Sequence, residues 1–283
     1  MRVEISNIPA WLVAVAVFVQ PVLTLAQDRL PDGGIAEGMG IRAWYEDPTE
    51  RYGHGILGDG IEAETLAIDA GGTIHRHTLA ADSVFEDLTP RIVDIDGDGM
   101  PEVLTIKTYL GEGATVAIYG IGPDGIAPLG EADPIGTPNR WLNPAGVADY
   151  DGDGIMEIAV VRTPHIGGIL ILYHWDGDDG RLVEELRQSG YSTHAIGSRD
   201  LDLAFSYDWN GDGIADLLLP DQRRTHLIAL SFAGGTVVEI DRYNIRREIA
   251  GGMEMMGNFL RVPLTGGPAR TLTRPYSEDE KDH

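Results

Sequence analysis

The sequence contains no cysteine, so disulfide bonds cannot stabilise the folded chain. Basic residues are also scarce: 21 lysines and arginines stand against 45 aspartates and glutamates among 283 residues, a formal net charge of −24. A surface with this charge repels phosphates and anionic membranes, and it favours cations or basic ligands. We therefore expect no nucleic-acid partner, and bound metal is the candidate for the missing stabiliser.

Long hydrophobic runs are scarce as well, and the only marked one reaches from Trp11 to Ala26. This run is short for a membrane span and is interrupted by Gln20 and Pro21. It predicts a signal peptide over residues 1–26 and a secreted or periplasmic protein, with an uncleaved N-terminal anchor as the alternative. No later stretch is long and apolar enough to span a bilayer, so we expect no membrane span after cleavage.

One acidic pattern, D-x-[DN]-G-D-G-x-x-[DE], occurs three times, each time before a short apolar run. The copies begin 55 and 59 residues apart, at Asp94, Asp149 and Asp208. Glycine-rich turns follow nearly the same period, with spacings of 53, 55 and 55 residues between Gly72, Gly125, Gly180 and Gly235. Two markers with one period predict four units over residues 41–264, preceded by an N-terminal segment, 27–40, and followed by a polar C-terminal tail, 265–283.

Each unit contains short segments rich in branched and aromatic residues, which is typical of strands. In the third and fourth units the expected strands are residues 158–162, 169–175, 182–186 and 201–207, then 217–219, 226–232, 237–240 and 255–262. Four strands every ~55 residues predict an all-β fold, a small β-propeller of about four or five four-stranded blades. An all-β sandwich with acidic turns is the alternative.

The first unit lacks the acidic pattern. We expect its middle strands at residues 61–68 and 73–79, on either side of a glycine-rich turn. The segment Trp44–Glu50 is acidic but lacks the alternate spacing of the other loops. It is therefore interpreted as a degenerate loop that no longer binds metal.

The acidic patterns predict calcium loops, because carboxylates crowded within nine residues repel one another unless a hard cation lies among them. Positions 1, 3, 5 and 9 supply side-chain oxygens, position 7 supplies a main-chain carbonyl, and glycines at positions 4 and 6 permit the turn. The first loop offers Asp94, Asp96, Asp98, the Met100 carbonyl and Glu102. The second offers Asp149, Asp151, Asp153, the Ile155 carbonyl and Glu157. The third offers Asp208, Asn210, Asp212, the Ile214 carbonyl and Asp216, and the neutral amide at position 3 should make it the weakest.

An EF-hand shares several of these positions, but it needs a glutamate at position 12 and flanking helices. Position 12 is Thr105, Val160 and Leu219 in the three loops. The EF-hand and its calcium switch are therefore excluded. Solvated acidic turns without a metal remain the alternative.

The acidic loop followed by a short apolar strand resembles the FG-GAP or VCBS repeat of integrin-α-like β-propellers, over roughly residues 41–264. The resemblance implies a propeller in which calcium ties neighbouring strands of a blade, and hence a mainly structural metal. Members often have seven blades, whereas four units are counted here. A four-bladed ring, a five-bladed ring that uses the chain ends, and part of an oligomer all stay open.

Sequence motifs of catalysis are absent: there is no G-x-S-x-G, no H-E-x-x-H, and no recognisable partner spacing among the histidines. We therefore favour an exported, calcium-binding, non-catalytic scaffold of the binding or adhesion type, with a protein or polysaccharide ligand. The alternative is an extracellular carbohydrate-active propeller enzyme, a lyase or hydrolase. Tyrosine, histidine, arginine and acid gathered at a central opening would favour the enzyme, and an apolar opening would favour the scaffold.

Overall fold

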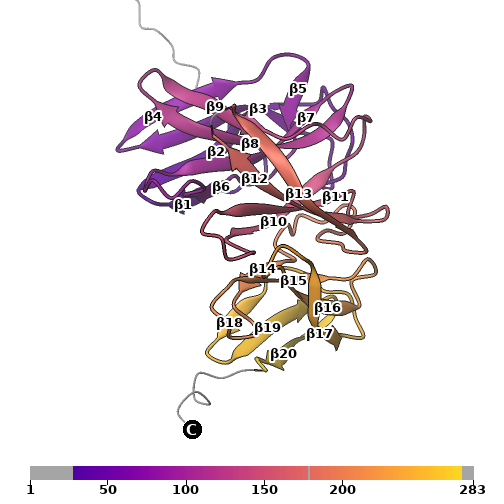
Figure 1. Ribbon diagram of the computed structural model, residues 1–283. Coiled ribbons are helices and arrows are strands. Elements are labelled where there is room, and N and C mark those ends of the chain that lie inside the picture. Colours follow the sequence, from indigo (N-terminus) through magenta and orange to yellow (C-terminus); the bar gives the residue numbers. More distant parts are fainter. Residues whose placement is uncertain (1–27, 178, 276–283) are drawn as a thin grey trace, which may run out of the picture.

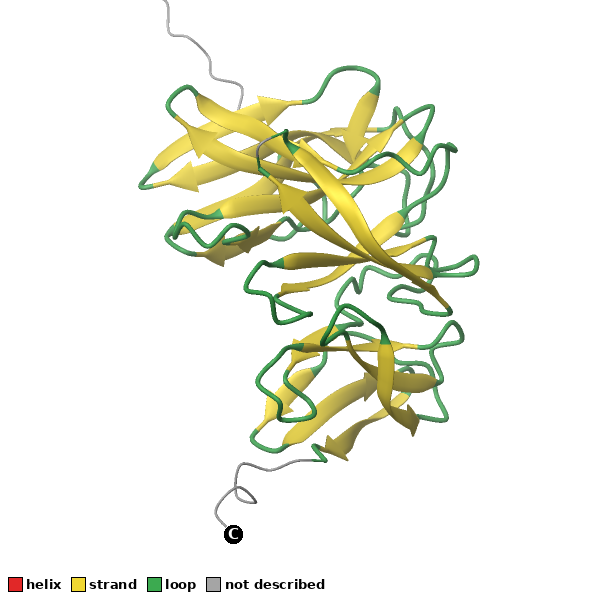
Figure 2. Cartoon of the chain, in the orientation of Figure 1, coloured by secondary structure: helices red, strands yellow, loops and turns green. Residues whose placement is uncertain are grey.

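The computed structural model describes residues 28–177 and 179–275, so the expected signal peptide, residues 1–26, lies outside the described residues. The described chain consists of strands, turns and loops and has no helix (Figure 2). Accordingly, no described segment forms a helix that is long and apolar enough to cross a membrane. The all-β prediction is confirmed, and the arrangement of the strands is consistent with a β-propeller-like fold.

Most strands belong to antiparallel meanders, in which each strand pairs with the next one along the chain. The first meander contains β1 (Ala36–Gly38), β2 (Ile41–Thr49), β3 (Glu62–Ala70) and β4 (Thr73–Thr78). The second contains β6 (Arg91–Val93), β7 (Glu102–Tyr109), β8 (Gly113–Gly122) and β9 (Gly125–Glu131). The third contains β10 (Leu142–Ala148), β11 (Glu157–Arg162), β12 (Ile169–Asp176) and β13 (Arg181–Ser189).

Two further meanders follow, which Figure 1 shows below the others. The fourth contains β14 (Phe205–Tyr207), β15 (Asp216–Pro220), β16 (His226–Ser231) and β17 (Val238–Asn244). The fifth has three strands, β18 (Glu254–Met256), β19 (Phe259–Leu264) and β20 (Gly267–Thr273). The second, third and fourth meanders thus repeat with the period of the acidic pattern.

The first three meanders are joined into one 13-stranded sheet. The short strand β5 (Ser83–Phe85) pairs with both β3 and β7, and a single parallel residue pair, Arg181 with Glu131, links β13 to β9. Strands β14–β17 and β18–β20 form separate sheets, and no sheet of the described chain closes on itself.

Apolar side chains hold neighbouring meanders together. One core cluster combines Leu104 and Ile118 of the second meander with Val160 of the third. Another combines Val161 of the third with Leu219 of the fourth. Burying such a side chain fully contributes about 1.5–3 kcal/mol, so these shared clusters dominate the attachment of one meander to the next.

The prediction of a degenerate loop at Trp44–Glu50 is wrong, because Trp44 to Thr49 belong to β2. Glu46 made the segment look like a loop, yet its carboxylate is buried and accepts hydrogen bonds from Arg76 Nε at 2.7 Å and Trp44 Nε1 at 2.9 Å. In the first meander the connection between the first and second strands is instead a two-residue turn, Met39-Gly40, with both φ angles positive. This turn has no carboxylate that could bind a metal.

Two other boundaries differ from the sequence expectation. The single strand expected at residues 255–262 is a hairpin, because positive-φ Gly257 starts a turn between β18 and β19. The range assigned to the polar tail, 265–283, begins with β20, whose Leu272 is buried against Leu260 of β19. A single apolar residue among polar neighbours was too weak a signal to predict that strand.

Candidate metal centres

Each acidic segment joins the first strand of a meander to the second. We call them loop one (residues 94–102), loop two (149–157) and loop three (208–216). The glycines at positions 4 and 6 have φ angles between 75° and 92°; they are Gly97, Gly99, Gly152, Gly154, Gly211 and Gly213. A side chain is strained at such angles, so the expected role of these glycines is confirmed.

One pattern of hydrogen bonds folds all three loops. The carboxylate at position 1 accepts from the N–H of position 6, at 3.0, 3.0 and 3.1 Å in loops one to three. Position 3 accepts from the N–H of position 5 at 3.1, 3.0 and 2.8 Å, and position 5 from the N–H of position 7 at 2.7, 2.8 and 2.9 Å. The acid at position 9 accepts from the N–H of position 2 at 2.8, 2.7 and 2.8 Å. The backbone thereby draws the acidic side chains to the inside of the loop.

Loops one and two bring carboxylate oxygens to the spacing of a shared cation. In loop two, Asp149, Asp151, Asp153 and Glu157 each offer an oxygen, and these oxygens lie within 4.8 Å of one another. In loop one the corresponding group is Asp94, Asp96 and Glu102, and it does not include Asp98. Oxygens on opposite sides of one calcium ion lie about 5 Å apart, so both groups fit a single ion.

The electrostatics of these loops are unfavourable without a cation. Burial raises the pKa of Glu102, and the neighbouring loop carboxylates raise it further. Burial also raises the pKa of Glu157 to about 7, with further contributions from Asp151, Glu185 and Asp149. In loop one, the buried Oδ1 of Asp94 has no hydrogen-bond partner among the described residues. A buried oxygen without a donor is the kind of atom that a bound cation satisfies.

Loop three is built differently. Its acids form no comparable group within the described chain, and Asn210 at position 3 donates to Asp212 at 2.9 Å. A positively charged side chain nevertheless lies against this loop: Arg274 Nη2 is 3.6 Å from Asp208 Oδ2. The Arg274 side chain is 8% exposed, its Nε donates to the Trp209 carbonyl at 3.3 Å, and its guanidinium lies 5.1 Å from the centre of the Tyr207 ring. The chain therefore supplies a guanidinium to the loop that has an amide in place of one carboxylate.

The residues at position 7 were expected to contribute only their carbonyls. Met100 and Ile155 are 60% and 54% exposed. Ile214 differs, because its Cδ1 lies only 2.6 Å from the place where a Cβ on Gly152 would stand. Loops two and three are thus neighbours in space, and the glycine of one makes room for the side chain of the other.

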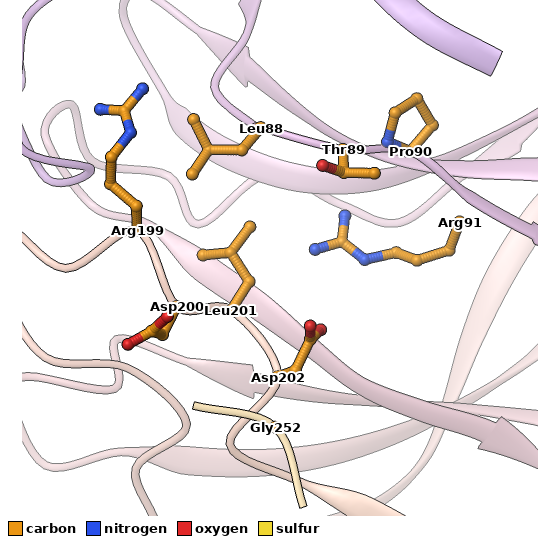
Figure 3. A pocket seen from close by; sticks show the side chains of 9 residues that line it. All are labelled: Leu88, Thr89, Pro90, Arg91, Arg199, Asp200, Leu201, Asp202 and Gly252. Atoms are coloured by element: carbon orange, nitrogen blue, oxygen red, sulfur yellow. The ribbon is translucent and has the colours of Figure 1, made fainter. Parts of the chain in front are cut away.

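Two adjoining cavities, of about 240 and 290 Å³, lie where the first strands of the meanders approach one another. Both are lined by Arg91, Leu201 and Asp202, whose side chains Figure 3 shows around the smaller cavity. Arg91 donates to Asp87 at 2.6 Å and Arg199 to Asp59 at 3.2 Å, so both guanidinium groups are already engaged. The second cavity is lined mainly by apolar residues of β6 and β10.

Two of the histidine contacts that the sequence did not predict involve a fully buried partner, His194 or Glu86. His165 Nε2 lies 2.9 Å from His194 Nδ1, and His194 Nε2 lies 2.8 Å from the Ser198 carbonyl. Because a neutral imidazole donates through only one nitrogen, His194 donates to that carbonyl and accepts from His165. Burial lowers the pKa of His165 to about 4, with the neighbouring His194 as the second cause. Similarly, His54 lies 2.6 Å from the buried Glu86. Neither pair has a spacing that the sequence could have signalled.

The family described as FG-GAP-like repeat matches residues 94–160, a segment that contains loops one and two. This confirms the resemblance to FG-GAP repeats for that part of the chain. A comparison with curated proteins finds no match.

Among solved structures, the chain is similar to Sqt1 of Saccharomyces cerevisiae, at 8% identity and a TM-score of 0.46, covering 90% of this chain and 64% of that one. It is also similar to a rhamnogalacturonan lyase of Bacillus licheniformis, at 15% identity and a TM-score of 0.45, covering 87% and 57%. A third structure, the rhamnogalacturonan lyase YesW, has 13% identity and a TM-score of 0.42, covering 86% and 60%. The chain spans less than two thirds of each of these proteins.

Proposed function

We propose that this chain is an exported scaffold of the binding or adhesion type whose acidic loops hold structural calcium. The observation that carries the proposal is the group of four carboxylates in loop two, whose oxygens lie within 4.8 Å of one another. Without a cation, four such groups would repel one another at the surface of the fold. The repeated hydrogen-bond pattern nevertheless holds them together.

Calcium is the ion that suits these loops best. All the ligands are oxygens, and no cysteine or histidine is present in any of the three loops. Calcium accepts six to eight oxygen ligands in flexible geometry, whereas magnesium demands a near-ideal octahedron. The ligands are the residues at positions 1, 3, 5, 7 and 9, with loop three as the weakest site because Asn210 and Arg274 reduce its need for an ion.

The scaffold itself is proposed as a small propeller. The first four meanders would be four-stranded blades, and β18–β20 would be an incomplete fifth blade. In each blade that carries a loop, calcium would tie the first strand to the second, beside the centre of the array. The central cavities favour neither class alone, because Arg91, Arg199, Asp200 and Asp202 line the smaller one, whereas mainly apolar residues line the larger one.

Calcium stoichiometry tests the proposal. Equilibrium dialysis of the purified chain should find three calcium ions, two bound more tightly than the third. Asp151→Ala should remove one of the tighter sites, because it takes a carboxylate from the centre of loop two. Asp124→Ala, in the exposed β8–β9 turn, is the matched control and should leave all sites intact. Absence of saturable calcium binding, or equal losses in both variants, would overturn the metal assignment.

A further inference from the structure

A basic segment, residues 242–275, lies between Asp241 and the acidic last residues of the chain, 276–283. Residues 242–275 contain six arginines and two glutamates, a formal net charge of +4, in a chain with a net charge of −24. Four of the arginines line one groove, which has a volume of about 740 Å³ and no acidic residue in its lining. We call it the arginine groove; it is lined by Arg242, Tyr243, Asn244, Ile245, Arg246, Arg247, Leu264, Pro268 and Arg270.

Three of these arginines have no carboxylate partner among the described residues. Arg247 Nη1 donates to the Gly266 carbonyl at 3.0 Å, and Arg270 Nη1 donates to the Asn244 carbonyl, so both side chains cross between the walls of the groove. A guanidinium has five N–H donors, and each of these uses one here. Arg246 is exposed and forms no ion pair within the described chain. Of the acids close to them in sequence, Asp241 accepts from the Tyr243 hydroxyl and Glu248 pairs with Arg224, whereas Glu239 pairs with Arg242, the fourth arginine of the groove.

Arg246 is one of seven non-glycine residues of the described chain with a positive φ angle. Its φ angle is +64°, in the left-handed region where a side chain costs of order 1 kcal/mol or more. A glycine would adopt this conformation without that cost. Keeping an arginine there holds an unpaired guanidinium at the groove at the expense of stability.

Both walls of the groove are formed by sheet edges. β17 is the last strand of the β14–β17 sheet, and β20 is the last strand of the β18–β20 sheet. Edge strands carry unpaired backbone N–H and C=O groups that an extended peptide can match. Arginine also binds carboxylates through two parallel hydrogen bonds. Nucleic acid and anionic membranes fit less well, because their dense phosphate charge is repelled by the rest of the chain.

We propose that the arginine groove binds an extended acidic segment of a partner protein, through Arg246, Arg247 and Arg270. The inference rests on the proposed scaffold role and names the chemistry of its partner. It does not involve the acidic loops, so loss of calcium binding and loss of peptide binding are separate results.

The test measures binding of a labelled glutamate–serine peptide by fluorescence anisotropy, beside the glutamine–serine peptide of the same length. The glutamate peptide should bind and the glutamine peptide should not. The variant Arg246→Glu/Arg247→Glu should weaken binding by about tenfold or more, since it removes two donors and adds two repulsive charges. Arg181→Glu/Arg187→Glu, on the exposed face of β13, makes the same charge change and should weaken binding by about threefold at most.

Arg246→Gly keeps the proposal testable if the double variant fails to fold. It should weaken peptide binding while leaving the melting temperature equal to or above that of the parent chain, because glycine relieves the positive φ. The proposal fails if the glutamate peptide does not bind, or if both double variants weaken binding equally. It also fails if dextran sulfate displaces the peptide at a far lower charge concentration than free glutamate peptide does, because the groove would then prefer a sulfated glycan.

Discussion

Loops two and three fold through the same hydrogen bonds, yet they balance their negative charge in different ways. Loop two gathers four carboxylates and has no basic residue of the described chain against it in an ion pair. Loop three has an amide at position 3 and an ion pair between Asp208 and Arg274. The comparison teaches that the backbone pattern is independent of the cation, so the sequence of a loop alone does not reveal which cation balances it.

A third way of balancing negative charge is found away from the loops, at Glu62 of β3. This carboxyl group is buried, and burial raises its pKa to about 9, followed by the effects of Glu86, Asp59 and Asp87. Here a proton balances the charge. Since the folded-state pKa is above the ordinary value of 4.5, stability is fully present below pH 4.5 and is lost as the pH rises towards 9.

The largest expected effect concerns this proton. One such group can lower the free energy of unfolding by up to about 1.4 kcal/mol for each pH unit between pH 5 and 9. Glu62→Gln should remove this pH dependence. Urea unfolding at several pH values, with a chelator present, measures it. Glu64→Gln, on the same strand and half-buried, is the control and should leave the slope unchanged. An unchanged slope in Glu62→Gln would show that Glu62 is ionised in the folded chain.

The next effect compares the two loops directly. Asp151→Ala should remove most of the calcium-dependent stability of loop two, on the order of 1–2 kcal/mol at a few millimolar calcium. Asn210→Ala should remove less, because it takes a neutral ligand from a loop that already has Arg274. Thermal unfolding of both variants with and without calcium gives the two increments. Equal increments would show that the amide and the carboxylate serve calcium equally.

The smallest expected effect distinguishes the contribution of the Arg274 guanidinium from that of calcium at loop three. Arg274→Met should lower stability without calcium by about 0.5–1 kcal/mol, and it should tighten calcium binding at loop three because a competing cation is gone. Arg261→Met, at an exposed position of β19, should change neither quantity. Titration calorimetry measures the calcium affinity, and thermal unfolding in the presence of a chelator measures the stability without calcium. If Arg274→Met weakens calcium binding instead, the guanidinium supports the metal site and does not compete with it.

Much of the fold was predictable because the chain repeats. The strands β11, β12, β15 and β16 agree with the expected ranges within one or two residues, since short runs of branched and aromatic residues and glycine turns mark each meander. The loops were predictable for the same reason. The first meander was misread because a buried acid, Glu46, was interpreted as a loop residue, whereas Arg76 on β4 neutralises it. That pairing depends on the register of two strands that are far apart in the sequence.

Contacts between distant segments account for what the sequence could not reveal. Arg274 reaches loop three because β20 packs beside β19. His165, in the β11–β12 connection, meets His194, in the segment that joins the third meander to the fourth. The arginine groove likewise combines β17 and the residues that follow it with β19 and β20. Each of these arrangements joins residues that carry no shared pattern or spacing.

Thermal unfolding with and without calcium tests most directly whether the ion stabilises the fold. At a few millimolar calcium, each carboxylate loop should add on the order of 1–2 kcal/mol, so a chelator should lower the melting temperature by at least about 5 °C. The far-UV strand signal at room temperature should stay the same, because the proposed role of calcium is to stabilise the meanders without switching their structure. A melting curve that does not move on chelation would contradict the account, and the acidic loops would then be only turns.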